Sequence, residues 1–193
     1  MEHRPTKSEE LFLSLGYNRF YDLFYEIMED DFWGNKPWYR FSKISNAFAV
    51  YAELLSYEAF EHVLKALKRQ RPPMEAEIGG PLLKFIRNVI AHSPLYESWE
   101  EIWISKTLVN WNREGLAIDR FLKKFSGHDE VKYRFWENDK KRMTYMSIKF
   151  PEKYSEEKIY LKDIISEKDG VKFSLIMMRK ILDTQIESAD GKT

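Results

Sequence analysis

Apolar residues recur every three to four positions in several stretches between residues 6 and 125, which is the period of amphipathic helices. Residues 6–29 are predicted to form the first helix, and Thr6 with Glu9 fits a capping box at its start. Gly16 is a point at which this helix is expected to divide into two pieces. The residues expected to face a core here are Leu11, Leu15, Phe20, Leu23, Phe24 and Ile27.

A polar loop is expected over residues 30–37, which contain glycine, asparagine and proline. Ser42 is the expected N-cap of a long second helix that ends near Gln70, before the prolines at 72 and 73. The apolar stripe of this helix consists of Ile44, Ala47, Phe48, Tyr51, Leu55, Ala59, Val63 and Leu67.

Three shorter helices are expected next. Pro81 is predicted to start a helix that runs to His92, since proline suits a first helical turn. A capping-box pattern predicts a short helix over residues 98–103, and a further helix is expected over residues 114–125. Residues 42–126 are therefore predicted to form a compact helical core.

The pattern changes after Gly127, where polar and apolar residues begin to alternate and β-formers become frequent. Residues 131–136 and 143–150 are predicted to pair as a β-hairpin around a polar turn. Residues 158–165 are a candidate third strand, and residues 172–187 are predicted to form the final helix. The inward positions of that helix are expected to be Phe173, Ile176, Met177, Ile181 and Leu182.

Length and composition favour one domain. The 193 residues are 44% hydrophobic and 16% aromatic, which is enough for a sizeable core. We therefore expect a single, mainly α domain over residues 1–193. It would consist of the helical core over 42–126 and an appended C-terminal β-hairpin and helix over 130–187.

Charge and residue usage exclude several classes of protein. Lysine plus arginine and aspartate plus glutamate both number 31, which argues against coating nucleic acid by bulk electrostatics but leaves room for a local basic site. The absence of cysteine excludes disulfides, cysteine zinc sites and thiol nucleophiles. No signal-peptide core occurs, and no apolar run nears the ~20 residues that span a bilayer. A soluble, cytoplasmic protein is expected, with no membrane attachment, metal or cofactor.

The most specific chemical pattern places Arg87, Asn88 and His92 on the predicted helix 81–92. At about 100° per residue, six apolar residues fill one arc of roughly 160°, and Arg87 and His92 lie roughly 140° apart at the edges of the polar arc. Histidine moves protons near neutral pH, and arginine matches phosphate oxygens. These side chains can therefore support phosphoryl transfer on RNA without a metal. Two copies about a two-fold axis would bring both sets into one cleft.

The segment Phe-Ile-Arg-Asn-Val-Ile-Ala-His-Ser at residues 85–93 resembles the R-x4-6-H signature of HEPN domains, including the polar residue after the arginine. HEPN proteins are small, helical and usually dimeric. Many are metal-independent endoribonucleases of toxin–antitoxin, abortive-infection and other defence systems, whereas others bind nucleotides or act as scaffolds. The resemblance covers mainly residues 42–126. It implies a HEPN-like helical bundle that works as a homodimer, with RNA as substrate and an antitoxin protein as a candidate partner.

The same resemblance implies a catalytic role for each motif residue. His92 would act as general base on an RNA 2′-hydroxyl, or as the acid that protonates the 5′-leaving oxygen. Arg87 would hold the scissile phosphate and stabilise the charge of the transition state. Asn88 would orient His92 or the phosphate by hydrogen bonding. The products would be a 2′,3′-cyclic phosphate and a 5′-hydroxyl.

Two basic clusters are candidates for contact with RNA. The first comprises Lys65, Lys68, Arg69 and Arg71 near the end of the long second helix, and Lys84 on the polar arc is a further candidate. A solvated helix end is the alternative for this cluster, because a helix C-terminus favours cations. The second is a basic hairpin with interleaved aromatics, which could touch RNA or a partner protein or simply cover the bundle. Its cations are Lys132, Arg134, Lys140, Lys141 and Arg142.

Two further functions stay open at this point. One is a non-catalytic HEPN-like module that binds a nucleotide or a partner protein. The other is a helical interaction protein in which the motif is coincidental, because a cation and a histidine in the last turns of any helix are favoured by the helix dipole.

Overall fold

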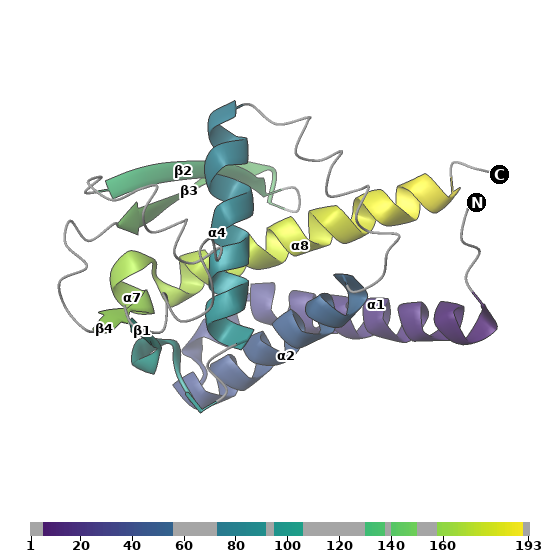
Figure 1. Cartoon of the computed structure of the whole chain (residues 1–193), viewed down its shortest axis with the longest axis horizontal. Helices are drawn as coiled ribbons and strands as arrows, with labels where there is room; N and C mark the ends of the chain where they lie inside the picture. Colours follow the sequence, from purple (N-terminus) through teal and green to yellow (C-terminus); the bar gives the residue numbers. More distant parts are fainter. Residues whose placement is uncertain are drawn as a thin grey trace. The chain divides into compact units, whose positions relative to one another are not determined.

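The computed structural model is mainly helical and ends in a β-hairpin and a long helix, which confirms the expected fold class (Figure 1). It divides into two compact units, Met1–Arg71 with Met177–Thr193 and Pro72–Ile176. The expectation of a single domain stays a prediction. Within the described part of the chain, no helix has the length and apolar character needed to cross a membrane. The structure describes residues 6–55, 73–91, 95–105, 130–137, 140–149 and 158–190.

The first unit begins with α1 (Lys7–Met28), whose predicted capping box is confirmed. The Thr6 hydroxyl accepts the N–H of Glu9 at 3.4 Å, and the Glu9 carboxylate accepts the N–H of Thr6 at 2.6 Å. Gly16 does not divide the helix, contrary to expectation. It lies where α1 meets the next helix, because a Cβ on Gly16 would stand 2.7 Å from Leu54 Cδ2. The glycine therefore permits a close approach between helices.

A short 3-10 helix, η1 (Asp30–Gly34), precedes α2 (Pro37–Leu55). The prediction that Ser42 caps the second helix is wrong, since Ser42 lies inside α2. The helix starts earlier because Pro37 has the fixed φ that suits a first turn. The carbonyl of Lys36 accepts the backbone N–H groups of both Tyr39 and Arg40 at 3.1 Å. The remainder of the predicted helix, to Gln70, lies outside the described residues.

An aromatic core joins α1 and α2, which pack side by side (Figure 1). The ring of Phe20 lies 6.2 Å from that of Tyr51 and 6.3 Å from that of Phe24, measured between centroids. Leu11 and Leu15 are exposed, because they lie about 180° and 140° around the helix from Phe20. The predicted core positions that are buried are Phe20, Leu23, Phe24, Ile27, Ile44, Ala47, Phe48 and Tyr51, and Leu54 is buried instead of Leu55.

The second unit begins with α4 (Pro73–Ala91). The prediction that this helix starts at Pro81 is wrong, because Pro81 lies in its interior. A proline in that position removes one backbone donor but does not end the helix here. Pro73 takes the first position, where a proline costs no hydrogen bond. The motif helix is therefore longer at its N-terminal end than the sequence indicated.

The predicted short helix over 98–103 is a single 3-10 turn, η2 (Trp99–Glu101). Ser98 precedes it without a capping hydrogen bond from its side chain. The Glu101 carboxylate instead accepts the backbone N–H of Glu97 at 3.3 Å. Trp103 belongs to a strand and not to the helix. The capping-box pattern was thus matched in sequence but its hydrogen bonds are not formed.

The candidate third strand over 158–165 is correct only at its start. β4 (Lys158–Tyr160) pairs antiparallel with β1 (Trp103–Ser105), not with the hairpin. The chain then turns into α7 (Leu161–Ile164). Three buried residues explain this change, because Leu161, Ile164 and Ile165 follow the i, i+3, i+4 spacing of a helix.

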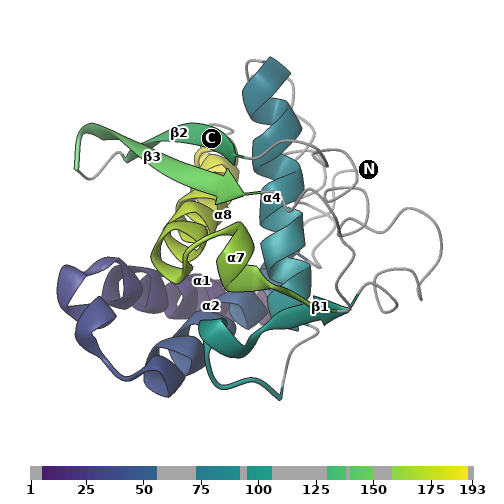
Figure 2. The ribbon, with the colours of Figure 1, turned by 90° about the vertical axis from the view of Figure 1, so that its left-hand side faces the viewer.

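The predicted hairpin is confirmed. β2 (Glu130–Glu137) pairs antiparallel with β3 (Arg142–Lys149), with Arg134 opposite Tyr145 at the centre. Figure 2 shows the hairpin with α4 and α7 of the same unit. At the turn, Lys141 has a φ of 48°, which lies in the left-handed region.

The final helix, α8 (Glu167–Asp190), begins before the predicted residue 172. Ser166 marks its start, since its hydroxyl accepts the N–H of Asp169 at 3.2 Å. The indole N–H of the buried Trp99 donates to the carbonyl of Ile165 at 3.1 Å, just before this helix. The division between the two compact units falls within α8, after Ile176.

Candidate functional site

The motif helix α4 has the two faces that its sequence predicts. Its apolar arc is buried throughout, with no member more than 7% exposed. On the other arc, Lys84 and Ala91 are exposed, and Arg87 and Asn88 are half-buried. The helix therefore packs by one side and presents its polar motif residues on the other. The buried arc consists of Leu82, Leu83, Phe85, Ile86, Val89 and Ile90.

Arg87 and Asn88 are joined by their side chains. The Asn88 amide oxygen accepts hydrogen bonds from Arg87 Nη2 at 3.2 Å and from Arg87 Nε at 3.4 Å. These two N–H groups belong to the planar fork that binds carboxylates and phosphates in other settings. A single amide oxygen that holds both of them restricts the rotation of the guanidinium. Asn88 therefore acts directly on the orientation of Arg87, a role that the sequence did not indicate.

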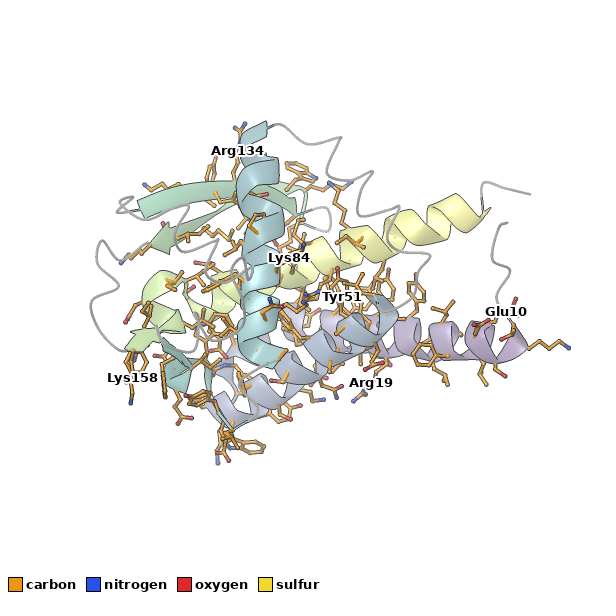
Figure 3. All side chains as sticks on the ribbon, in the orientation of Figure 1. Glu10, Arg19, Tyr51, Lys84, Arg134 and Lys158 are labelled. Carbon is orange, nitrogen blue, oxygen red and sulfur yellow. The ribbon has the colours of Figure 1, made fainter. Side chains whose placement is uncertain are left out.

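Lys84 lies one turn before Arg87 on the same helix (Figure 3). Residues three apart on a helix are neighbours, so Lys84 and Arg87 share one side of α4. The structure thus places three of the predicted site residues, Lys84, Arg87 and Asn88, along one helix. The other predicted site residues, His92, Lys68, Arg69 and Arg71, lie outside the described residues, as does the predicted helix over 114–125.

The described residues contain no group of three or more metal-ligating side chains close enough to hold an ion. Over residues 84–91 of α4, the polar side chains are one guanidinium, one amide and one ammonium group. Guanidinium and ammonium groups bind anions, and an amide can orient them. This set of groups fits a phosphate ester as its ligand.

The hairpin is a second candidate surface. The register between β2 and β3 determines which of its residues lie on the same face. Lys132 and Arg134 are exposed, as predicted, and so are Lys140, Lys141 and Arg142 near the turn. The sequence did not indicate which aromatic residues share this exposed side. Strand alternation combined with the register would have identified them, because Trp136 and Tyr145 occupy the same face as Arg134.

Comparison of the chain with protein-family models, curated proteins and solved structures finds no match in any of the three.

Proposed function

We propose that the protein is a metal-independent endoribonuclease of the HEPN type. In this proposal Arg87, Asn88 and His92 cleave RNA by transesterification through its 2′-hydroxyl. One observation carries it: the guanidinium of Arg87 is held by the Asn88 side chain on the polar arc of a helix whose opposite arc is fully buried. An arginine that is fixed in this way is prepared to meet an anion of fixed geometry.

The roles follow from the chemistry of each side chain. Arg87 contacts the phosphate that carries the bond to be cleaved, and its charge stabilises the oxygens that become more negative in the transition state. Asn88 keeps the guanidinium in position. His92, four residues after Asn88 in the sequence, takes the proton of the 2′-hydroxyl or donates one to the 5′-oxygen that leaves. In this single transesterification, the 2′-oxygen forms a bond to phosphorus as the bond between phosphorus and the 5′-oxygen breaks. One proton leaves the 2′-hydroxyl, and one is donated to the 5′-oxygen.

A complete site needs both a base and an acid, and one chain supplies a single histidine in this motif. The helical period of the sequence predicts a separation of roughly 140° between Arg87 and His92, which is wide for cooperation within one copy. We therefore include a homodimer in the proposal, in which two copies of α4 meet across a two-fold axis. Such a site contains two histidines, one for each proton transfer. The biological setting that goes with this chemistry is a toxin or defence nuclease held in check by an antitoxin protein.

The test is cleavage of RNA by the purified protein in EDTA, followed by analysis of the new ends. Wild type is expected to leave 2′,3′-cyclic phosphates and 5′-hydroxyls, and both Arg87→Ala and His92→Ala are expected to be inactive. Arg19→Ala is the matched control, because Arg19 is an exposed arginine on α1, remote in sequence from the motif (Figure 3). Preparing all four proteins identically removes contaminating ribonuclease as an explanation.

Two results would contradict the proposal. Cleavage that persists in both motif variants would show that other residues perform it, and cleavage that requires a divalent cation would exclude the mechanism. A tight complex with a nucleotide, without cleavage by any form, would identify the protein as a non-catalytic binding module.

A further inference from the structure

The hairpin β2–β3 has two faces of opposite character. In an antiparallel pair, residues directly opposite each other project from the same side. Tyr133 opposite Met146 is buried on one side, and Arg134 opposite Tyr145 is exposed on the other. The register therefore sorts the hairpin into an inner face and an outer face.

The inner face anchors the hairpin to its own unit. The ring of Tyr133 meets that of Phe173 edge to face, with centroids 5.4 Å apart. Met146 and Ile148 are buried beside it. At the end of β2, the buried Glu137 carboxylate accepts from the Thr144 hydroxyl and lies 3.4 Å from the guanidinium of Arg142. These contacts hold the hairpin in place without using the side chains of the outer face.

The outer face combines large apolar side chains with cations. Trp136 is 48% exposed and Tyr145 is 64% exposed, and Met143 lies directly opposite Trp136. A patch of large exposed aromatic residues is typical of a binding surface, because removal of a ring from water on binding is favourable. On the same face, the exposed Lys132 and Arg134 precede Trp136 along β2, and Tyr145 lies opposite Arg134.

Charge is concentrated in the same segment. Residues 130–149 contain six lysines and arginines and three acids, whereas the two types number 31 each in the whole chain. One of those acids, Glu137, is buried on the inner face. The excess positive charge of the segment therefore lies at its exposed positions, which attracts a polyanion.

We propose that the outer face of the hairpin, defined by Lys132, Arg134, Trp136, Met143 and Tyr145, binds single-stranded RNA. The cations contact phosphates, and Trp136 and Tyr145 stack on unpaired bases. Rings that lie beside cations on one open face match a flexible strand that offers both bases and phosphates. A duplex hides its base faces, and the carboxylates of an acidic peptide offer no flat face on which Trp136 and Tyr145 can stack. The choice of RNA over DNA rests on the proposed function.

The experiment measures binding of a fluorescent 2′-O-methyl oligouridine of about 12 nucleotides, a length within the range that single-strand sites occupy. The methyl group removes the nucleophile of the cleavage reaction, so binding is measured independently of catalysis. Failure of the proposed nuclease activity and failure of this surface are therefore separate results.

Two pairs of variants distinguish stacking from charge. Trp136→Ala and Tyr145→Ala are each expected to weaken binding about 10-fold, as loss of one stacked base does. The double variant Lys132→Gln with Arg134→Gln is expected to lower the slope of log K against log salt by about 1.4, or about 0.7 for each phosphate contact. The matched controls are Trp38→Ala and Lys36→Gln, because Trp38 is 55% exposed and Lys36 is exposed, both in the other unit. The controls are expected to bind as wild type does.

Circular dichroism of every variant establishes that the substituted proteins are folded. The proposal is overturned if the folded Trp136 and Tyr145 variants bind the probe as tightly as wild type, or if the Trp38 control loses as much affinity as they do. Equal affinity for a duplex of the same length would also overturn it. Displacement of the probe by polyglutamate as readily as by unlabelled RNA would identify the surface as a site for acidic proteins instead.

Discussion

The hydroxyl of Tyr21 on α1 donates a hydrogen bond to the carboxylate of Asp183 on α8, joining residues 162 positions apart in the sequence. Arg179 completes this cluster, with Nε 3.4 Å from Asp183 and its guanidinium 5.0 Å from the centre of the Phe24 ring. Tyr17 stacks on Tyr21 at 6.5 Å between centroids. These polar and aromatic contacts together join α8 to α1 within the first unit.

Replacement of Tyr21 by phenylalanine removes this hydrogen bond and keeps the ring. The free energy of unfolding is expected to fall by about 1.5–3 kcal/mol, the usual contribution of a hydrogen bond to a charged group. Urea unfolding measures the change. Tyr25→Phe is the matched control, because Tyr25 lies on the same helix and is 53% exposed. An equal fall in the free energy of unfolding in both variants would mean that the hydrogen bond from Tyr21 to Asp183 does not stabilise the fold.

Alkaline pH is expected to destabilise the fold through the same tyrosines. Burial and the negative charge of Asp183 raise the pKa of Tyr17 from 10.0 to about 12. Burial also raises the pKa of Tyr21, as does its hydrogen bond to Asp183. Above pH 10 the unfolded chain loses these protons while the folded protein keeps them. The free energy of unfolding therefore falls as pH rises from 10.0 to about 12.

Unfolding measured across this range in the double variant Tyr17→Phe with Tyr21→Phe should show a shallower decline than in wild type. A decline of unchanged steepness would assign the alkaline sensitivity to other groups.

Two glycines are expected to respond to alanine in opposite directions. A Cβ on Gly170 would lie 3.0 Å from Trp99 Cη2 and 3.3 Å from Ile165 Cγ2, whereas one on Gly34 would meet nothing within 4 Å. Gly170→Ala should destabilise the protein by about 1–3 kcal/mol through overpacking against a buried indole. Gly34→Ala should stabilise it by about 0.4–1 kcal/mol by restricting the unfolded chain. Thermal unfolding of both variants measures the difference, and a stabilising Gly170→Ala would refute the close packing.

Arg87→Lys separates charge from shape at the candidate site. Lysine keeps the positive charge but lacks the planar fork whose two N–H groups Asn88 holds. Under the proposed function, kcat for RNA cleavage should fall about 10²–10³-fold, as when a transition-state donor is removed. Stability should change by no more than about 0.5 kcal/mol, since the position is only half-buried. Full activity in this variant would show that charge alone is sufficient.

The predictions that the structure confirms rest on residues that are close together in the sequence. The Thr6–Glu9 capping box and the alternation of the hairpin strands involve neighbouring residues, and both are confirmed. The apolar arc of α4 was predicted for the same reason, because helix periodicity alone determines which residues share a face. The positions of Arg87 and Asn88 on the opposite arc follow from that periodicity.

Features that depend on distant parts of the chain were not predicted. Gly16 does not break α1, because Leu54 of another helix occupies the space beside it. The strand at β4 pairs with β1 across more than fifty residues, and no local pattern specifies that partner. The contact between Arg87 and Asn88 depends on side-chain rotamers, which the identity of the two residues does not determine. Two predictions that relied on prolines were wrong. Pro37 is expected in a loop but starts a helix, and Pro81 is expected at the start of a helix but lies inside one.

Lys141, at the hairpin turn, occupies a backbone conformation that glycine adopts at no cost and that costs another residue roughly 1–2 kcal/mol. The turn thus gives up stability at a position that carries an exposed positive charge. Lys141→Gly would make the hairpin more stable and remove one cation from the hairpin that we propose binds RNA. Under that proposal, protein stability and affinity for a polyanion are in conflict at this residue, and selection for stability alone would weaken the proposed binding.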